Sequence, residues 1–269
     1  MLKHRDHKEV SLFTPENLLR EARRQKAIVK QRIPPTCVLD PDGDIVKHLR
    51  RTRRAARSPY WACYHSELYE SQLNSGAIGI VGCAVGAPYA VLVAEEMFAS
   101  GCTFLLSITS AGKVRPQIGD PRYLVLSRAL RDEGTSDRYL PPGGYANLGE
   151  RLLATLRVQL AQSPVPLGIG TSWTTDAPFR ETSSAINRAR DHGAVCVEME
   201  AAALYAFAQA QQRDVVCVAH LTNAMAQSKG DFEKGVDNGS VDSLKLIEFL
   251  VHTLRRERHG SSSKEKSRP

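Results

Sequence analysis

Strand-like and helix-like segments alternate between residues 77 and 254, and this alternation restricts the fold more than any other feature of the chain. Short apolar runs predict buried strands over 77–81, 103–108, 166–172, 194–197 and 215–219. Helical spacing of apolar residues predicts helices over 88–99, 148–162, 183–192, 201–211 and 241–254. A sheet built this way is covered on both faces. The sequence therefore predicts a single α/β domain with a mixed, mostly parallel central sheet flanked by helices.

The charge of the chain suggests a division into three parts. The 269 residues carry a formal net charge of +7, and the excess of Lys and Arg lies at the two ends. We expect an N-terminal helical extension over 1–36, with a helix at 15–31 capped by Thr14, then the α/β domain over 37–254. The stretch 255–269 is basic and lacks an apolar period, so a disordered tail is predicted there.

Composition and motifs exclude several classes of protein. No basic segment is interleaved with stacking aromatics, so no specific nucleic-acid partner is expected. The longest apolar stretch, 84–94, is shorter than the ~20 residues that cross a bilayer, and no signal peptide is visible. We therefore expect a soluble, cytoplasmic protein with no membrane partner. The six cysteines show no C-x-x-C spacing, so we expect reduced, buried thiols and no metal site.

Candidate ligand-binding segments follow the predicted strands, because ligands of open α/β sheets bind beyond the carboxyl ends of the strands. These segments are Gly82–Pro88, Thr109–Gly112, Trp173–Thr182, Glu198 with Glu200, and Thr222 with Asn223. Together they suit a small ligand with hydroxyl groups and a flat ring. Glu198 and Glu200 are two residues apart and should point in opposite directions, so at most one faces a ligand and the other forms a cap or an ion pair. Taken alone, Phe179 reads as a core residue and His220 as a structural histidine.

The segment Val197–Tyr205 resembles the V-E-M-E-x-A-A signature of the hexameric nucleoside phosphorylase family. This family includes uridine phosphorylases, bacterial purine nucleoside phosphorylases and methylthioadenosine nucleosidases. Gly82–Pro88 is similar to its glycine-rich loop, Thr109–Gly112 to its G-[ST]-x-G phosphate turn and Thr174–Phe179 to its base-pocket segment. Thr222 and Asn223 stand where the purine enzymes carry Ser-Asp. The resemblance covers roughly residues 37–250.

The resemblance implies cleavage of a ribonucleoside by phosphate, which yields a free base and ribose 1-phosphate. Its implied catalytic residues are Glu200, which would bind the ribose hydroxyls beside Met199, and Asn223, which would hydrogen-bond the base. Phe179 and Arg180 are expected to join Asn223 at the base, while Gly86, Thr109 and Ser110 would bind phosphate. No cofactor is expected besides phosphate as co-substrate. A homo-oligomer, dimer or hexamer, is also implied.

This chain departs from the family at the arginines that hold phosphate. Ser107 stands where one arginine precedes the phosphate turn, and Ile45 stands where another is expected in an early segment. The cluster Arg50–Arg57, reaching a neighbouring subunit's site, or Arg180 could replace them. Two alternatives stay open: a phosphate-independent nucleosidase, although nucleosidases rely on an Asp where this chain has Asn223, and a catalytically inactive nucleoside-binding sensor. The identity of the base and any 5′-modification of the sugar are not predicted.

Overall fold

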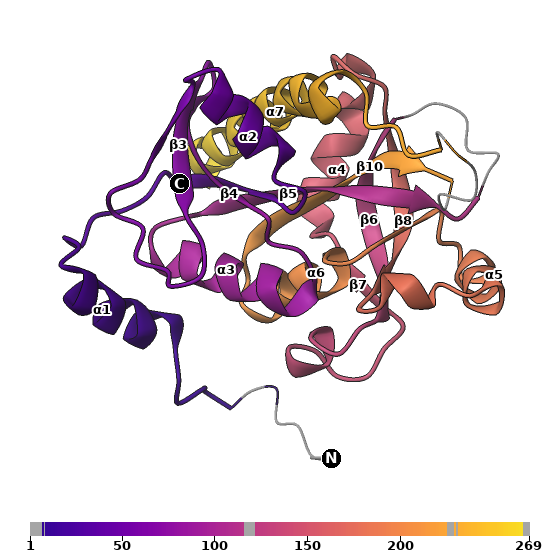
Figure 1. Cartoon of the computed structure of the whole chain (residues 1–269), viewed down its shortest axis with the longest axis horizontal. Helices are drawn as coiled ribbons and strands as arrows, with labels where there is room; N and C mark the ends of the chain where they lie inside the picture. Colours follow the sequence, from indigo (N-terminus) through magenta and orange to yellow (C-terminus); the bar gives the residue numbers. More distant parts are fainter. Residues whose placement is uncertain (1–6, 8, 116–121, 225–228, 230, 266–269) are drawn as a thin grey trace.

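The computed structural model describes residues 7, 9–115, 122–224, 229 and 231–265, which form one ten-stranded sheet with helices on both faces (Figure 1). The strands are β1 (Thr36–Asp40), β2 (Ala55–Arg57), β3 (Leu68–Leu73), β4 (Gly76–Gly82), β5 (Phe104–Lys113), β6 (Tyr123–Asp132), β7 (Tyr145–Asn147), β8 (Leu167–Thr175), β9 (Cys196–Glu198) and β10 (Asp214–Asn223). The α-helices are α1 (Pro15–Lys26), α2 (Asp44–Arg51), α3 (Ala87–Ala99), α4 (Glu150–Gln159), α5 (Ser183–Asp191), α6 (Ala201–Ala210) and α7 (Ser240–Glu265). Short 3-10 turns are η1 (Ser136–Arg138), η2 (Leu160–Gln162), η3 (Pro178–Arg180) and η4 (Val236–Gly239).

The sheet is parallel at its centre and closes on itself on one side. Strands β4, β1, β5 and β10 lie side by side and are all parallel. From β10 the sheet continues through β6, β8 and β9, and β9 returns to pair with β5 in antiparallel fashion. The antiparallel strands β3 and β2 extend the other edge. The predicted mixed α/β fold, a central sheet flanked by helices, is thereby confirmed.

Helices cover the two faces of the sheet unequally. Helices α3 and α6 pack together on one face, and α2, α4 and α7 lie on the other (Figure 1). Eight of the ten residues of α6 are buried, because this alanine-rich helix lies between the sheet and α3. The Tyr205 hydroxyl donates to the carbonyl of Leu126 at 2.5 Å, which ties α6 to β6. This central position fixes the N-terminus of α6, where the Glu-Met-Glu motif lies.

Several elements differ from the sequence prediction. The fully buried strand β1 was not predicted, and it lies between β4 and β5. The predicted strands at 77–81 and 103–108 are therefore parallel but do not pair directly. The predicted turn at 109–112 is part of β5, which stays paired with β10 as far as Gly112. Strands β3 and β6 and helix α2 were missed as well. Charged residues interrupt the apolar patterns of β3 and α2, whereas β6 opens on a short apolar run, 123–126, that the prediction overlooked.

The helices at both ends of the chain end at other residues than the sequence predicts. Helix α1 begins at Pro15 with the Thr14 cap, as predicted, but it ends at Lys26 because Ala27 adopts a left-handed conformation. Helix α7 continues past residue 254 to Glu265, so the prediction of disorder is wrong over 255–265. The Arg255 guanidinium donates to the carbonyl of Ser75 and to the Thr36 hydroxyl, which ties this part of α7 to the sheet. Residues 266–269 of the predicted tail and 1–6 and 8 of the predicted extension lie outside the described residues.

Five cysteines are buried as predicted, and all six are free thiols. Cys83 is exposed, contrary to the prediction, because the Gly82–Pro88 turn carries it out of the sheet with a positive φ of 62°. Across the described part of the chain, no helix has both the length and the apolar character needed to cross a membrane.

Candidate functional site

Strand register brings three of the predicted segments together. In the β5–β10 pair, Ser110 lies opposite His220 and Gly112 lies opposite Asn223. Gly112 also pairs with Val197 of β9, the residue that precedes the Glu-Met-Glu motif. The predicted phosphate segment, the Glu-Met-Glu motif and Asn223 are therefore neighbours in the sheet, although they are far apart in sequence.

The two glutamates of the motif have different roles in the fold. Glu198 Oε2 accepts the backbone N–H groups of Glu200 and Ala201, each at 2.7 Å, and Glu198 Oε1 accepts the Thr174 hydroxyl. Glu198 therefore caps the N-terminus of α6, where backbone N–H groups lack helical partners. Of the two expected roles for the internal glutamate, a cap or an ion pair, Glu198 forms the cap.

Glu200 is the buried carboxylate that remains. Its exposed fraction is 1%, and its Oε1 accepts the Gly86 N–H at 2.8 Å. Its Oε2 makes no hydrogen bond of ordinary geometry to any described residue. Burial and the nearby Glu198 raise the pKa of Glu200 to about 8, and donors at Gly86 and Thr109 offset this only in part. An unpaired buried oxygen is costly, and a hydroxyl donor from a ligand would relieve that cost.

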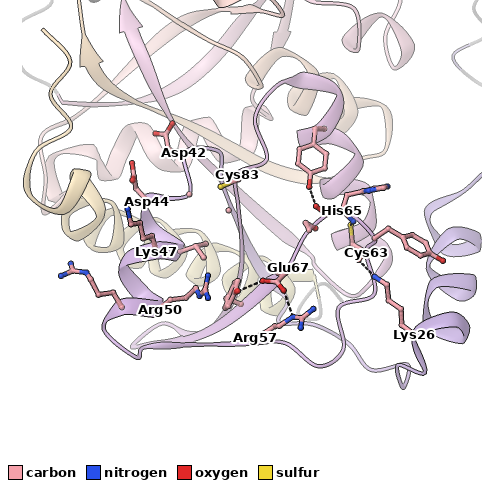
Figure 2. A pocket seen from close by; sticks show the side chains of 18 residues that line it. Lys26, Asp42, Asp44, Lys47, Arg50, Arg57, Cys63, His65, Glu67 and Cys83 are labelled. Carbon is pink, nitrogen blue, oxygen red and sulfur yellow. Dashed lines mark hydrogen bonds and ion pairs between the residues drawn. The ribbon is translucent and has the colours of Figure 1, made fainter. Parts of the chain in front are cut away.

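The Gly82–Pro88 turn borders a large open cavity and also contacts Glu200 through Gly86. The cavity has a volume of about 1120 Å³ and is bordered by Gly82 and Cys83 of this turn (Figure 2). Met199, next to Glu200, is half-buried, and Gly86 has a φ of 88° with open space where a Cβ would lie. Because Gly86 donates to Oε1 of Glu200, a ligand hydroxyl that binds this oxygen has to compete with the turn, whereas Oε2 makes no ordinary hydrogen bond to a described residue. The Gly86 N–H, predicted to bind phosphate, is used for this contact.

Several cations line the cavity, among them Arg50, Arg51 and Arg57 of the cluster that could replace the missing phosphate arginines at a neighbouring subunit's site. Arg50 lies over the Tyr69 ring at 4.9 Å, and Arg57 pairs with Glu67 at 3.1 Å. Further charged lining residues are Lys26, Lys47, Asp42 and Asp44. These groups give the cavity an excess of positive charge. A contribution of Arg50–Arg57 to a neighbouring subunit stays a prediction.

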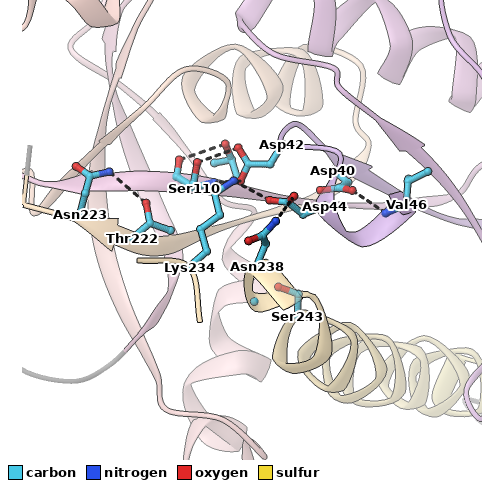
Figure 3. A network of polar contacts seen from close by, with 12 residues as sticks. Asp40, Asp42, Asp44, Val46, Ser110, Thr222, Asn223, Lys234, Asn238 and Ser243 are labelled. Carbon is cyan, nitrogen blue, oxygen red and sulfur yellow. Dashed lines mark hydrogen bonds and ion pairs between the residues drawn. The ribbon is translucent and has the colours of Figure 1, made fainter. Parts of the chain in front are cut away.

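The predicted phosphate donors of Ser110 are engaged by a carboxylate of the chain. The Ser110 hydroxyl donates to Asp42 Oδ1 at 2.9 Å, and the Ser110 N–H donates to Asp42 Oδ2 at 3.2 Å (Figure 3). Lys234 Nζ lies 3.1 Å from Asp42 and 2.7 Å from Asp44. The contact of Asp42 with Ser110 was not predicted, because the two residues are 68 positions apart in the sequence. Sequence analysis missed Lys234 entirely, because no local pattern marks that residue.

The residues predicted to hold the base are less enclosed. Phe179 lies on η3 after Pro178 with an exposed fraction of 99%, so reading it as a core residue is wrong. Arg180 is exposed too, and the roles of both residues at the base remain predictions. Asn223 is half-buried, and its amide donates to the Thr222 hydroxyl at 3.2 Å.

His220 is buried, but its Nε2 makes no hydrogen bond to any described residue, so its structural role stays a prediction. Its ring stacks on Tyr123 with centroids 4.5 Å apart, and burial lowers its pKa to about 4. Among the described residues, no group of three or more His, Cys, Asp or Glu side chains could hold a metal ion.

Comparisons with known proteins bear on the family and the fold of the chain. The family model described as the phosphorylase superfamily matches residues 35–254. A purine nucleoside phosphorylase from Toxoplasma gondii, solved with immucillin-H, superposes with a TM-score of 0.71 at 15% identity, covering 86% of this chain and 98% of that one. A uridine phosphorylase from Vibrio fischeri, solved with 6-hydroxy-1-naphthoic acid, gives 0.69 at 19% identity, covering 87% and 99%. A second structure of a Vibrio fischeri uridine phosphorylase gives 0.68 at 18% identity, covering 95% and 100%. No curated protein matches the sequence.

Proposed function

Because the chain belongs to the phosphorylase superfamily, we propose that it cleaves the N-glycosidic bond of a purine or pyrimidine ribonucleoside with phosphate, releasing the base and ribose 1-phosphate. The observation that carries this proposal is the buried Glu200 carboxylate, one oxygen of which makes no ordinary hydrogen bond to any described residue. It follows β9, whose Val197 pairs with Gly112 of β5, and Gly112 in turn pairs with Asn223 of β10.

The chemistry of the reaction uses groups of this kind. As the bond to the base breaks, positive charge develops on the ribose and negative charge on the base. A carboxylate held against the 2′- and 3′-hydroxyls positions the sugar and favours the cationic transition state. Hydrogen bonds from these hydroxyls lower the pKa of Glu200, so the substrate itself would favour its ionised form. The Asn223 amide can donate to the departing base, although it cannot transfer a proton.

One observation favours water as the acceptor in place of phosphate. Asp42 engages the N–H and the hydroxyl of Ser110, the donors that the family uses for phosphate. Hydrolysis to base and ribose is therefore the second candidate reaction.

A panel of purine and pyrimidine ribonucleosides, incubated with and without phosphate, tests both reactions by chromatography of the released base. Release that depends on phosphate supports phosphorolysis, and release without phosphate identifies a hydrolase. Binding without release contradicts both reactions and identifies a nucleoside-binding sensor. Glu200→Ala should lower cleavage at least about 100-fold, whereas Glu16→Ala, an exposed site on α1, serves as the matched control. Near-normal cleavage by Glu200→Ala would refute the ribose role.

A further inference from the structure

We propose that the Asp42 carboxylate competes with the acceptor anion for the same donors. Asp42 holds the groups to which inorganic phosphate would bind, and it thereby sets the affinity of the site for phosphate. This inference deepens the proposed function and rests on it, because the proposed reaction identifies the anion bound at this site as phosphate.

The carboxylate of Asp42 binds as an external oxyanion would. One oxygen accepts the Ser110 hydroxyl at 2.9 Å, and the other accepts the Ser110 N–H at 3.2 Å and the Lys234 ammonium at 3.1 Å. A hydroxyl, a backbone N–H and a cation form a donor set suited to a phosphate group. Asp42 and phosphate cannot both use it at the same time.

The backbone holds Asp42 firmly in this position. The Asp40 carboxylate accepts the Val46 N–H at 2.9 Å inside the first turn of α2, and the Asp40 carbonyl accepts the N–H groups of Gly43 and Cys83. Gly43 adopts a φ of 75°, which turns the chain sharply between β1 and α2. A ligand on a short, fixed connection acts at a high effective concentration, so Asp42 competes strongly with phosphate in solution.

Lys234 is the cation that would serve either anion. It is shared by Asp42 and Asp44, and Asp44 also accepts the Asn238 amide at 3.0 Å. Although burial lowers the pKa of Lys234, the hydrogen bond to Asp44 and the charge of Asp42 raise it on balance, so this ammonium stays charged. Two carboxylates against one ammonium leave the contact cluster negative, which disfavours a phosphate dianion while Asp42 is in place.

Asp44 provides a matched control for Asp42. Both carboxylates contact Lys234, and removal of either changes the net charge equally, but only Asp42 contacts Ser110. Inorganic phosphate is titrated calorimetrically into the full chain, as wild type, Asp42→Ala and Asp44→Ala, at pH 7.5 and constant ionic strength. We expect Asp42→Ala to bind phosphate at least about tenfold more tightly than wild type, and Asp44→Ala to change binding no more than about threefold.

Equal or weaker phosphate binding by Asp42→Ala, or the same gain in Asp44→Ala, overturns the proposal. Lys234→Met in the Asp42→Ala background should abolish the gain, and a retained gain would also overturn it. If Asp42→Ala fails to fold by circular dichroism, Asp42→Asn replaces it, with a gain over wild type as the criterion. No nucleoside is needed, so an absence of nucleoside cleavage would refute the proposed function without deciding this titration.

Discussion

Replacing Glu200 by glutamine should stabilise the fold at high pH while it removes the carboxylate that we propose to bind ribose. In the folded protein, burial raises the pKa of Glu200 from 4.5 to about 8. The folded chain therefore keeps the proton between these two values, while the unfolded chain releases it. Under proton linkage, the contribution of Glu200 to the free energy of unfolding falls as pH rises through this window.

The size of the effect follows from the same interval. Each pH unit corresponds to about 1.4 kcal/mol, so the full interval sets an upper bound of about 5 kcal/mol. Local relaxation that admits water would reduce this value. We therefore expect the free energy of unfolding of Glu200→Gln to rise by at least about 2 kcal/mol relative to that of the wild type between pH 5 and pH 9.

Urea unfolding followed by circular dichroism at pH 5, 7 and 9 measures the difference. Glu16→Gln on the surface of α1 is the matched control for loss of a carboxylate, and we expect it to follow the wild-type curve. Parallel curves for Glu200→Gln and wild type, or a lower stability of the variant at pH 9, would refute the view that Glu200 is held desolvated beneath Gly86.

Two other predictions concern residues outside the ribose site. Burial lowers the pKa of His220 to about 4, so the wild-type protein should lose up to about 3 kcal/mol of stability as pH falls from 6.5 toward 4. His220→Phe, which can keep the stack on Tyr123, should flatten this dependence in urea unfolding, and an unchanged slope would contradict it. Cys83 is the exposed thiol, so Ellman's reagent should titrate one fast-reacting group in the native chain, absent in Cys83→Ser. A second thiol reacting at a similar rate would count against the assigned burial of the others.

Within the site, sequence analysis succeeded where the signal was local. The Glu-Met-Glu motif at the start of an alanine-rich helix predicted one glutamate in a cap or an ion pair and at most one facing a ligand, and Glu198 indeed caps α6. The prediction that Phe179 is a core residue was wrong, because its exposure depends on how η3 leaves the sheet. The residues next to Phe179 in the sequence do not reveal this path. Strand β1 was not predicted because a five-residue run after two prolines carries little periodicity.

The sequence by itself determined the α/β class and most helices and strands beyond residue 77, because apolar periodicity and helix caps are properties of neighbouring residues. Only the tertiary structure decided what surrounds Ser110. Asp42 follows β1, Ser110 lies in β5 and Lys234 precedes η4, and their contact arises from strand order and loop paths. Charge and hydrogen bonding act through space, so a carboxylate that looks like a solvated loop residue in the sequence accepts the N–H and the hydroxyl of Ser110 in the fold.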